Sequence, residues 1–193
     1  MMVPLFILVL LLGLVLVGCQ ATRAGYESAP YRVVRSEGGI ELREYPAMVW
    51  VETAMASRGN GADGSFNRLF RFITGGNEQK QKIAMTTPVF MTGQGTNATM
   101  AFVMPATMTK TAVPRPGDEA VSVRQLAGGQ YAVVRFSGGR SEANETAALQ
   151  RLESWLRTQK LPVKSSPVFG YFDPPWTPPF LRRNEVMLPV DVR

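Results

Sequence analysis

KIAMTTPVFM at residues 82–91 and KSSPVFGYF at residues 164–172 carry the same short pattern, a hydroxyl residue followed by Pro-Val-Phe. Two other pairs of segments lie at a similar separation. FVMP at 102–105 resembles VMLP at 186–189, and VWVETA at 49–54 resembles AVVRFS at 132–137. The offsets of roughly 80 residues are longer than the ~20–50-residue periods of solenoid repeats. The sequence therefore predicts one structural unit that occurs twice.

Each predicted copy contains strands on either side of one helix. Alternating apolar residues and turn signals predict strands at 31–36, 40–45, 47–56, 83–91 and 99–104 before the Pro/Gly-rich loop at 113–119, and at 121–126, 130–136, 166–172 and 185–190 after it. Glycine pairs at 38–39 and 128–129 predict hairpins. Two strand–strand–helix–strand–strand copies give an α+β domain whose sheets curl together, with the helices outside or across an opening.

The two helices are predicted from the spacing of apolar residues. The first begins at Ser65, which can cap it, and stops at Gly75-Gly76. The second runs from about Ser141 to Gln159 and stops before a proline. Their apolar faces contain Phe66, Leu69, Phe70 and Ile73 in the first helix, and Ala148, Leu152, Trp155 and Leu156 in the second.

The N-terminal segment has the composition of an export signal. Residues 1–18 contain no charged side chain, and residues 3–18 read VPLFILVLLLGLVLVG. The LVGC that ends this run resembles the lipobox of bacterial lipoproteins, whose cysteine becomes the acylated N-terminus. We predict a signal peptide at 1–18, a lipidated Cys19 with a linker to residue 30, and a folded domain at 31–193. An uncleaved N-terminal anchor is the alternative.

Both alternatives place the folded body beside a membrane and facing away from the cytoplasm. Gln20, rather than Asp, follows Cys19, which resembles lipoproteins that move to the outer membrane. We therefore expect a bacterial envelope protein that faces the periplasm and has the lipid membrane as a partner.

The composition excludes several kinds of catalytic and metal site. The 193 residues include no histidine and one cysteine, Cys19. Ser–His catalysis, Cys–His catalysis and His/Cys zinc sites are therefore excluded. The net charge of +6 suits anionic lipid, acidic ligands or small molecules that carry carboxylates. Because Lys and Arg form no compact cluster, nucleic acid is not an expected partner.

Three longer segments resemble the SOUL/haem-binding protein family: GSFNRLFRFITGGNEQKQKIAMTTPVFM, MAFVMP and FDPPWTPPFLRRNEVMLPV. The likeness spans nearly the whole predicted domain, and Asp173 stands where the family usually has Asn. It implies a distorted antiparallel barrel of about eight strands with two helices, built from two pseudo-symmetric ββαββ halves. It also implies non-catalytic binding of haem or a related porphyrin in a groove between the first helix and the late Pro/aromatic loop.

The residue types in those two segments suit a flat apolar ligand with carboxylates at its edge. In the late Pro/aromatic loop, the prolines hold the aromatic rings on a stiff chain. The arginine side chains of both segments suit the carboxylates of such a ligand. Core packing explains the apolar face of the first helix equally well. Arg182 and Arg183 of the late loop can be ordinary surface charges. The predicted binding residues are Phe66, Arg68, Leu69, Phe70, Arg71, Ile73, Met85, Tyr171, Phe172, Trp176, Phe180 and Arg182.

Histidine cannot ligate an iron in this chain. Met85, Met91, Met104, Tyr171 or a water remain as ligands, although methionines also fill gaps in cores. We therefore predict a porphyrin groove of low specificity, which binds hemin and metal-free protoporphyrin with similar affinity.

Three other functions fit parts of the sequence. Met100, Met104 and Met108 have thioethers that suit Cu(I), although a proline interrupts any helix that would align them. Glu185 and Tyr171 suit acid/base work in a small-molecule hydrolase, or a drug-binding cleft. A purely structural envelope lipoprotein is the last alternative.

Overall fold

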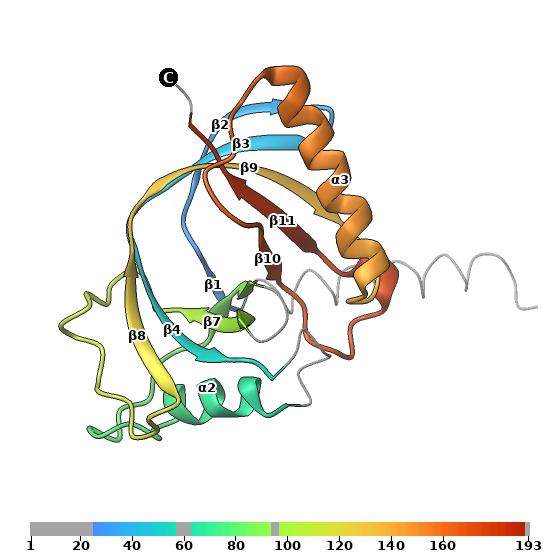
Figure 1. The fold of residues 1–193 in the computed structure, drawn as a ribbon. Helices are drawn as coiled ribbons and strands as arrows, with labels where there is room; N and C mark the ends of the chain where they lie inside the picture. The colour runs from blue at the N-terminus through green and yellow to red at the C-terminus, as the bar shows by residue number, and fades with distance from the viewer. Residues whose placement is uncertain (1–24, 57–62, 94–96, 192–193) are drawn as a thin grey trace, which may run out of the picture.

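The computed structural model describes residues 25–56, 63–93 and 97–191. Within these ranges it contains helices α2 (Ser65–Ile73) and α3 (Glu142–Gln159), the 3-10 helix η2 (Pro179–Leu181) and eleven strands (Figure 1). The fold is therefore α+β, as the sequence predicts. The strands are β1 (Glu27–Ser28), β2 (Arg32–Glu37), β3 (Ile40–Tyr45), β4 (Met48–Ala54), β5 (Thr86–Thr87), β6 (Val89–Thr92), β7 (Thr99–Val103), β8 (Val121–Leu126), β9 (Gly129–Phe136), β10 (Val168–Tyr171) and β11 (Asn184–Pro189).

Nine of the strands form one antiparallel sheet in the order β2-β3-β9-β11-β10-β6-β7-β4-β8. β1 and β5 form a separate parallel pair. With β2 set aside, the order is symmetric about the β10–β6 pair, because β11, β9 and β3 follow on one side and β7, β4 and β8 on the other. The two predicted halves therefore share one continuous sheet.

The first strand of each half is exchanged with the other half. β3 precedes β4 in the chain but pairs with β9, and β8 precedes β9 but pairs with β4. The predicted hairpin at Gly38-Gly39 joins β2 to β3. The predicted hairpin at Gly128-Gly129 is wrong, because β8 and β9 each pair with other strands. The exchange ties the halves together at both ends of the sheet.

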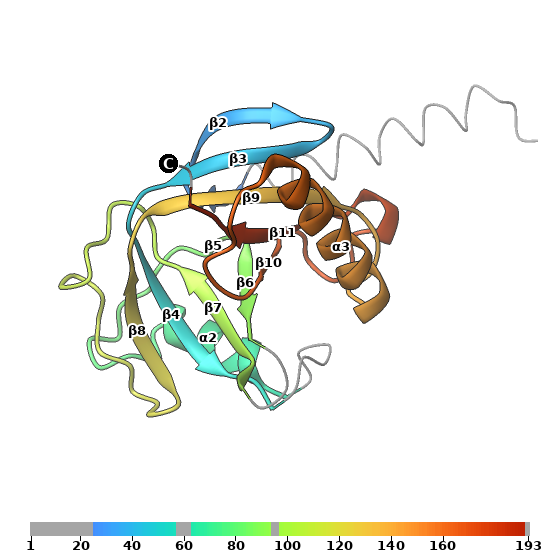
Figure 2. The ribbon, with the colours of Figure 1, turned by 45° about the horizontal axis from the view of Figure 1, so that its top comes forward.

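The sheet curls without closing into a barrel. Among the described strands, β2 and β8 are its two edges. Figure 2 shows β2, β3 and β9 on one side of the curl and β4, β7 and β8 on the other, with the two walls converging where β3 leads into β4 and β8 into β9. The two halves contribute eight of the strands, and β2 adds a ninth.

Each helix covers one half of the sheet, and both helices lie on the same side of it. Met91 of β6 belongs to the apolar cluster beneath α2, and its register partner Phe169 of β10 belongs to the cluster beneath α3. Residues on the other side of both halves form a shared core, in which Trp50 stacks on Phe90 at 4.8 Å between ring centroids. The helices therefore lie outside the curl, and the halves meet inside it.

The two helices begin differently. The second helix begins after Ser141, close to the predicted start, and Ser141 caps it, because its Oγ accepts the backbone N–H of Asn144 at 3.3 Å. The predicted Ser65 cap of α2 is wrong. α2 starts at Ser65 after Gly64, and the Ser65 hydroxyl donates to Asp63 at 2.7 Å.

The Pro-Val-Phe segments lie side by side at the centre of the sheet. Pro88 divides the predicted strand 83–91 into β5 and β6, and the Thr87–Pro88 bond is cis. The Pro88 ring lies over Gly170 of β10, where an added Cβ would stand 3.2 Å from Pro88 Cγ. Glycine at this position therefore permits the close approach of the two halves.

No helix in the described ranges is long and apolar enough to cross a bilayer. The predicted signal peptide at 1–18 and the predicted lipidation site Cys19 lie outside the described residues. β1, at Glu27–Ser28, falls within the predicted linker.

Candidate ligand-binding site

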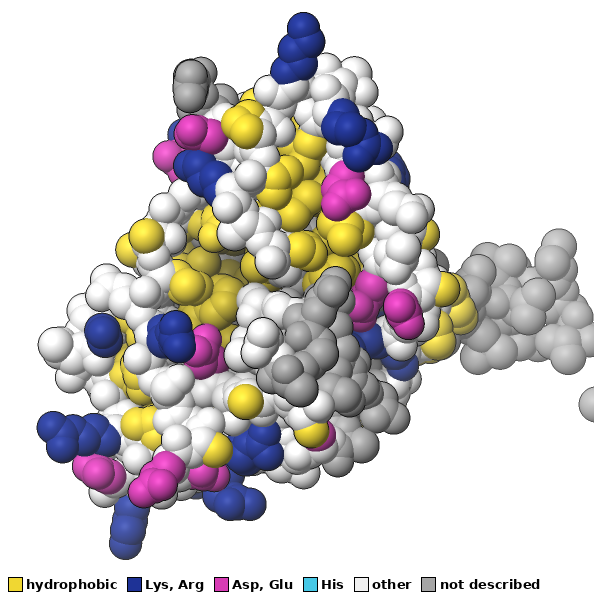
Figure 3. All heavy atoms as spheres, viewed as in Figure 1, with side chains coloured by type: hydrophobic (Ala, Val, Ile, Leu, Met, Phe, Trp, Pro, Cys, Tyr) yellow, Lys and Arg dark blue, Asp and Glu magenta, His cyan; other side chains and the backbone are white. Residues whose placement is uncertain are grey.

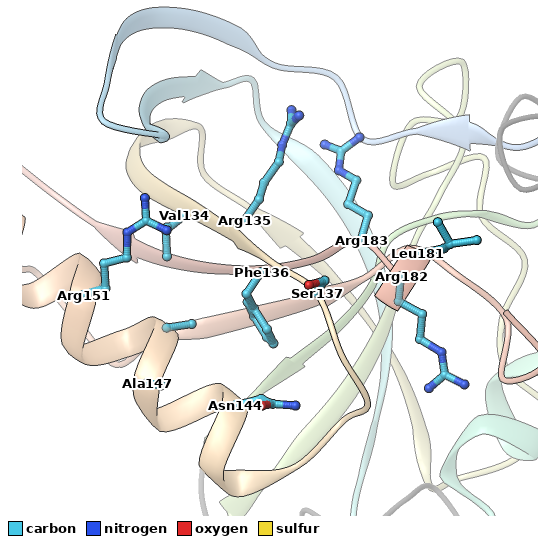
Figure 4. A pocket seen from close by; sticks show the side chains of 11 residues that line it. Val134, Arg135, Phe136, Ser137, Asn144, Ala147, Arg151, Leu181, Arg182 and Arg183 are labelled. Carbon is cyan, nitrogen blue, oxygen red and sulfur yellow. The ribbon is translucent and has the colours of Figure 1, made fainter. Parts of the chain in front are cut away.

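A pocket of about 730 Å³ opens between the end of β9, the first half of α3 and residues 181–183 (Figure 4). It forms where β9 runs past its neighbour, since β3 begins opposite Val134 whereas β9 continues to Phe136. Small-molecule sites usually measure ~300–1,000 Å³. The second half of the molecule therefore has a cavity of suitable size for an organic ligand.

One wall of the pocket is apolar. It is formed by Val134, Phe136, Ala147, Ala148 and Leu181. Figure 4 shows the Phe136 ring directed towards α3, with Asn144 beside it. The helix presents small alanine side chains here, and their size leaves the space that the pocket occupies.

Four arginines surround this wall. Arg135 and Arg183 extend towards β2, whereas Arg182 points in the opposite direction (Figure 4). Arg151 donates to the carbonyl oxygen of Gly38 at 2.6 Å, which ties α3 to the β2–β3 turn. The rim therefore has the positive charge that a carboxylate ligand requires.

A buried carboxylate organises two of these arginines. Glu185 is 1% exposed and accepts hydrogen bonds from Arg43, Arg135 and Arg183. The shortest contacts are 2.7 Å from Arg43 Nη1 and 2.7 Å from Arg183 Nη2. Arg43 is itself fully buried and also donates to Glu41 at 2.7 Å and to the Tyr45 hydroxyl at 3.1 Å. Glu185 thus holds Arg135 and Arg183 at the pocket from the side of the sheet opposite to Phe136 and α3.

The charges in this network shift the pKa values of its members. Burial alone would raise the pKa of Glu185, but the hydrogen bonds and charge of Arg43, followed by those of Arg183, hold it below its ordinary value. Burial raises the pKa of Tyr45 to about 12 despite the nearby Arg43. Glu185 is therefore ionised at neutral pH and is not a proton donor there.

The prediction that Glu185 and Tyr171 share one cleft is wrong. Tyr171 of β10 is the register partner of Asn184, and Glu185 is the partner of Gly170. Because successive strand residues point to opposite sides of a sheet, the two side chains lie on opposite sides. The tyrosine hydroxyl instead donates to Glu145 of α3.

The Tyr171–Glu145 pair lies on the helix-bearing side of the sheet. Glu145 is buried, and Arg140 forms an ion pair with it at 3.8 Å. The Arg140 guanidinium also lies over the Tyr171 ring, 5.4 Å from its centroid. Tyr171 packs against the apolar clusters of both halves. The predicted binding residue Tyr171 is thus a half-buried residue between the halves rather than part of the pocket wall.

The predicted residues of the first helix lie in the other half of the molecule and do not line this pocket. Leu69 and Ile73 are fully buried in the core beneath α2. Phe66 and Phe70 are partly exposed and stack on one another, with ring centroids 5.9 Å apart. The predicted common face of four residues is therefore divided into a buried pair and a surface pair.

The remaining predicted residues near α2 are polar or half-buried. Arg68 donates to Thr53 Oγ1 at 3.0 Å and to the Ala54 carbonyl at 2.7 Å, so it braces the helix against β4. Arg71 lies in the last turn of α2 and is exposed. Met85 is half-buried against the cluster beneath α2. None of them lies beside the arginine rim.

The late Pro/aromatic loop borders the pocket through Leu181 and Arg182. The Arg182 guanidinium donates to the carbonyl oxygens of Thr177, at 2.7 Å, and Pro175, so it braces the loop itself. Phe172 is buried beneath Arg183, whose guanidinium carbon lies 3.9 Å from the ring centroid. Trp176 and Phe180 are 78% and 67% exposed and are not part of the pocket wall.

The pocket lining combines apolar side chains with arginines. It contains no methionine or tyrosine, and the chain has no histidine. In the described ranges no group of three or more Cys, Asp or Glu side chains is arranged to hold a metal ion.

Sequence reasoning missed the residues that α3 and β9 contribute to the pocket. Phe136 follows the alternating pattern of a strand, and Ala147 looks like any helix-surface alanine. The feature that could have indicated this wall is a small helix residue packed beside a strand that extends beyond its neighbouring strand. That signal depends on the exchanged pairing of β3 with β9.

Comparisons with known proteins agree on the fold. The C-terminal domain of EcmrR superimposes with a TM-score of 0.59 and 13% identity, over 84% of this chain and 99% of that domain. A hydrolase from Listeria innocua superimposes with a TM-score of 0.60 and 13% identity, over 82% of this chain and 94% of the hydrolase. An uncharacterised conserved protein from Listeria innocua superimposes with a TM-score of 0.61 and 12% identity, over 79% of this chain and 92% of that protein. A comparison with curated protein sequences found no match.

The sequence is similar to one family over most of its length. The family model described as SOUL heme-binding protein matches residues 26–189. That range includes every strand of the large sheet, both helices and the pocket between β9 and α3. The chain therefore belongs to the SOUL heme-binding protein family.

Proposed function

We propose that this chain binds haem or a related porphyrin, without catalysis, in the pocket between β9, α3 and residues 181–183. One observation carries the proposal: an apolar wall and an arginine rim meet in a single cavity of suitable volume. The family to which the chain belongs supports the ligand class.

The residues present define how the ligand would be held. The face of the macrocycle would lie against Phe136 and the alanines of α3. Its propionates would meet Arg151 and the exposed edges of Arg135 and Arg183. Because Glu185 already fixes two of these arginines, less side-chain entropy is lost when a carboxylate binds.

Bound haem would supply its own iron chemistry, and the pocket wall adds no side chain that prefers iron. Affinity would then come from the macrocycle and its carboxylates. Hemin and metal-free protoporphyrin should therefore bind with similar affinity. A preference for hemin of a hundredfold or more would contradict this part of the proposal.

The surface pair Phe66–Phe70 on α2 is the rival position for the same ligand. It offers two nearly parallel rings, 14° apart, and Phe66 also packs edge-on against Phe102. It corresponds to the groove that the sequence predicts on the first helix. The late loop that should form the other side of that groove instead borders the α3 pocket, so we favour the pocket.

A titration with matched tryptophan variants tests the position. Ala147→Trp fills the pocket from an exposed helix position, and Thr146→Trp places the same ring on the next exposed residue, outside the pocket. Absorbance titration with hemin and with protoporphyrin should show at least a tenfold loss of affinity for Ala147→Trp alone. Unchanged binding in Ala147→Trp, with loss in Phe70→Ala, would move the site to α2.

We further propose that Cys19 is acylated and anchors the body to the bacterial envelope, with the outer membrane favoured. The LVGC pattern after an uncharged apolar run supports this. Labelled fatty acid should be incorporated by the wild-type chain and not by Cys19→Ser. Equal incorporation by both chains would contradict the assignment.

A further inference from the structure

Two aromatic rings of the late loop are left without a role by the proposed pocket. Trp176 and Phe180 are the most exposed large hydrophobic residues in the described ranges, at 78% and 67%. Figure 3 shows hydrophobic side chains projecting from the edge of the molecule where Figure 1 places η2. Large aromatic side chains are mostly buried in folded proteins, so two rings exposed to this extent on one short loop point to an interaction site.

The exposure of these rings is a fixed feature of the loop. The Thr177 N–H donates to the Pro174 carbonyl at 3.0 Å, and Arg182 Nε donates to the Thr177 carbonyl at 2.7 Å. The Gly138 N–H donates to the Pro179 carbonyl at 2.9 Å, which fastens the loop to the start of α3. Prolines restrict the rest of the segment. The rings are therefore held outwards by a braced scaffold, with little ordering cost for a partner.

We propose that residues 174–181 insert Trp176 and Phe180 into the interface of the membrane that carries the lipid anchor. Tryptophan and phenylalanine are typical of side chains that enter the boundary between headgroups and acyl chains. This inference rests on the proposed acylation of Cys19. The six residues from Cys19 to Ala24 extend over at most about 20 Å, so an acylated Cys19 would keep the body beside the bilayer.

The charges around the loop favour apolar insertion over attraction to anionic lipid. The segments 138–145 and 172–183, which meet at the Gly138–Pro179 hydrogen bond, contain equal numbers of basic and acidic residues. These are Arg140, Arg182 and Arg183 against Glu142, Glu145 and Asp173. Insertion should therefore occur in zwitterionic phosphatidylcholine and change little with salt.

Bromolipid quenching of the full chain in phosphatidylcholine vesicles tests the inference. Trp50 is buried on Phe90 and Trp155 is half-buried under Arg35, so Trp176 is the tryptophan placed to meet brominated acyl chains. Dibrominated phosphatidylcholine should quench the wild-type chain, and Trp176→Leu should lose most of that quenching. A double variant, Phe70→Trp with Trp176→Leu, restores an exposed tryptophan on α2 and should stay unquenched.

Each other outcome overturns the inference in a distinguishable way. If the chain does not float with the vesicles, the anchor fails and the insertion fails with it. If the chain floats but Trp176 is not quenched, the loop inference alone is wrong. An emission shift of Trp176 that depends on protein concentration without lipid would show that a second copy covers the rings. Equal quenching of the α2 reporter would show that contact with lipid is not specific to the loop.

Discussion

Replacing Glu185 by Gln should destabilise the chain by about 3–5 kcal/mol, the usual cost of breaking a buried ion pair. Glu185 is 1% exposed and its partner Arg43 is fully buried. The substitution keeps the shape and an acceptor oxygen but removes the charge that balances three guanidinium groups. For a chain of this size, such a loss lowers the melting temperature by about 6–20 °C.

A matched control tests whether the loss of stability depends on the burial of the ion pair or on the loss of any ion pair. Glu44 pairs with Arg32, and both side chains are largely exposed, at 46% and 70%. Exposed pairs contribute ~0–1 kcal/mol, so Glu44→Gln should be nearly neutral. Thermal and urea unfolding at pH 7 measure both variants. If Glu185→Gln lies within 1 kcal/mol of Glu44→Gln (about the limit for an exposed pair), the reasoning about the network is refuted.

The same substitution has a pH signature. The pKa of Glu185 is lower in the folded chain than in the unfolded chain. Its stabilisation is therefore fully present above the unfolded value of about 4.3 and is lost as the pH falls through the folded value. The stability difference between the wild type and Glu185→Gln should shrink below about pH 4. A difference that grows on acidification would contradict the assigned charge state.

The remaining predictions concern packing. Leu69→Ala should lower the free energy of unfolding by about 2–5 kcal/mol, because Leu69 is fully buried. Phe70→Ala on the same helix should lower it by less than about 1 kcal/mol. Equal losses of stability in urea unfolding would contradict the division of the α2 face into a buried pair and a surface pair. Gly170→Ala should cost about 1–3 kcal/mol, because the added Cβ would meet the Pro88 ring at 3.2 Å. A stability equal to that of wild type would show that the two halves have room to separate at this point.

The duplication and most element boundaries could be predicted from the sequence because they depend on local patterns. Each Pro-Val-Phe segment, and each run of apolar residues at helical spacing, can be recognised from a few neighbouring residues. The exchange of β3 and β8 between halves could not be predicted in this way. It depends on which strands pair across the whole chain, and the glycine pair at 128–129 wrongly indicated a local hairpin.

The candidate site shows the same limit. The Pro/aromatic loop was recognisable, and Leu181 and Arg182 do border the pocket. The opposite wall comes from α3 and β9, whose contribution depends on β9 extending beyond β3. Likewise, the sequence predicted that Glu185 and Tyr171 lie in facing segments of one cleft. The register of β10 with β11 instead places their side chains on opposite sides of the sheet.

Porphyrin ring currents offer the most direct test of the proposed binding position. Methyl resonances of a labelled chain are recorded by NMR before and after addition of metal-free protoporphyrin. The methyl groups of Val134, Ala147 and Leu181 should show the largest upfield shifts, because they line the pocket. Shifts confined to Leu69 and Ile73, the buried apolar residues of α2, would contradict the proposed site.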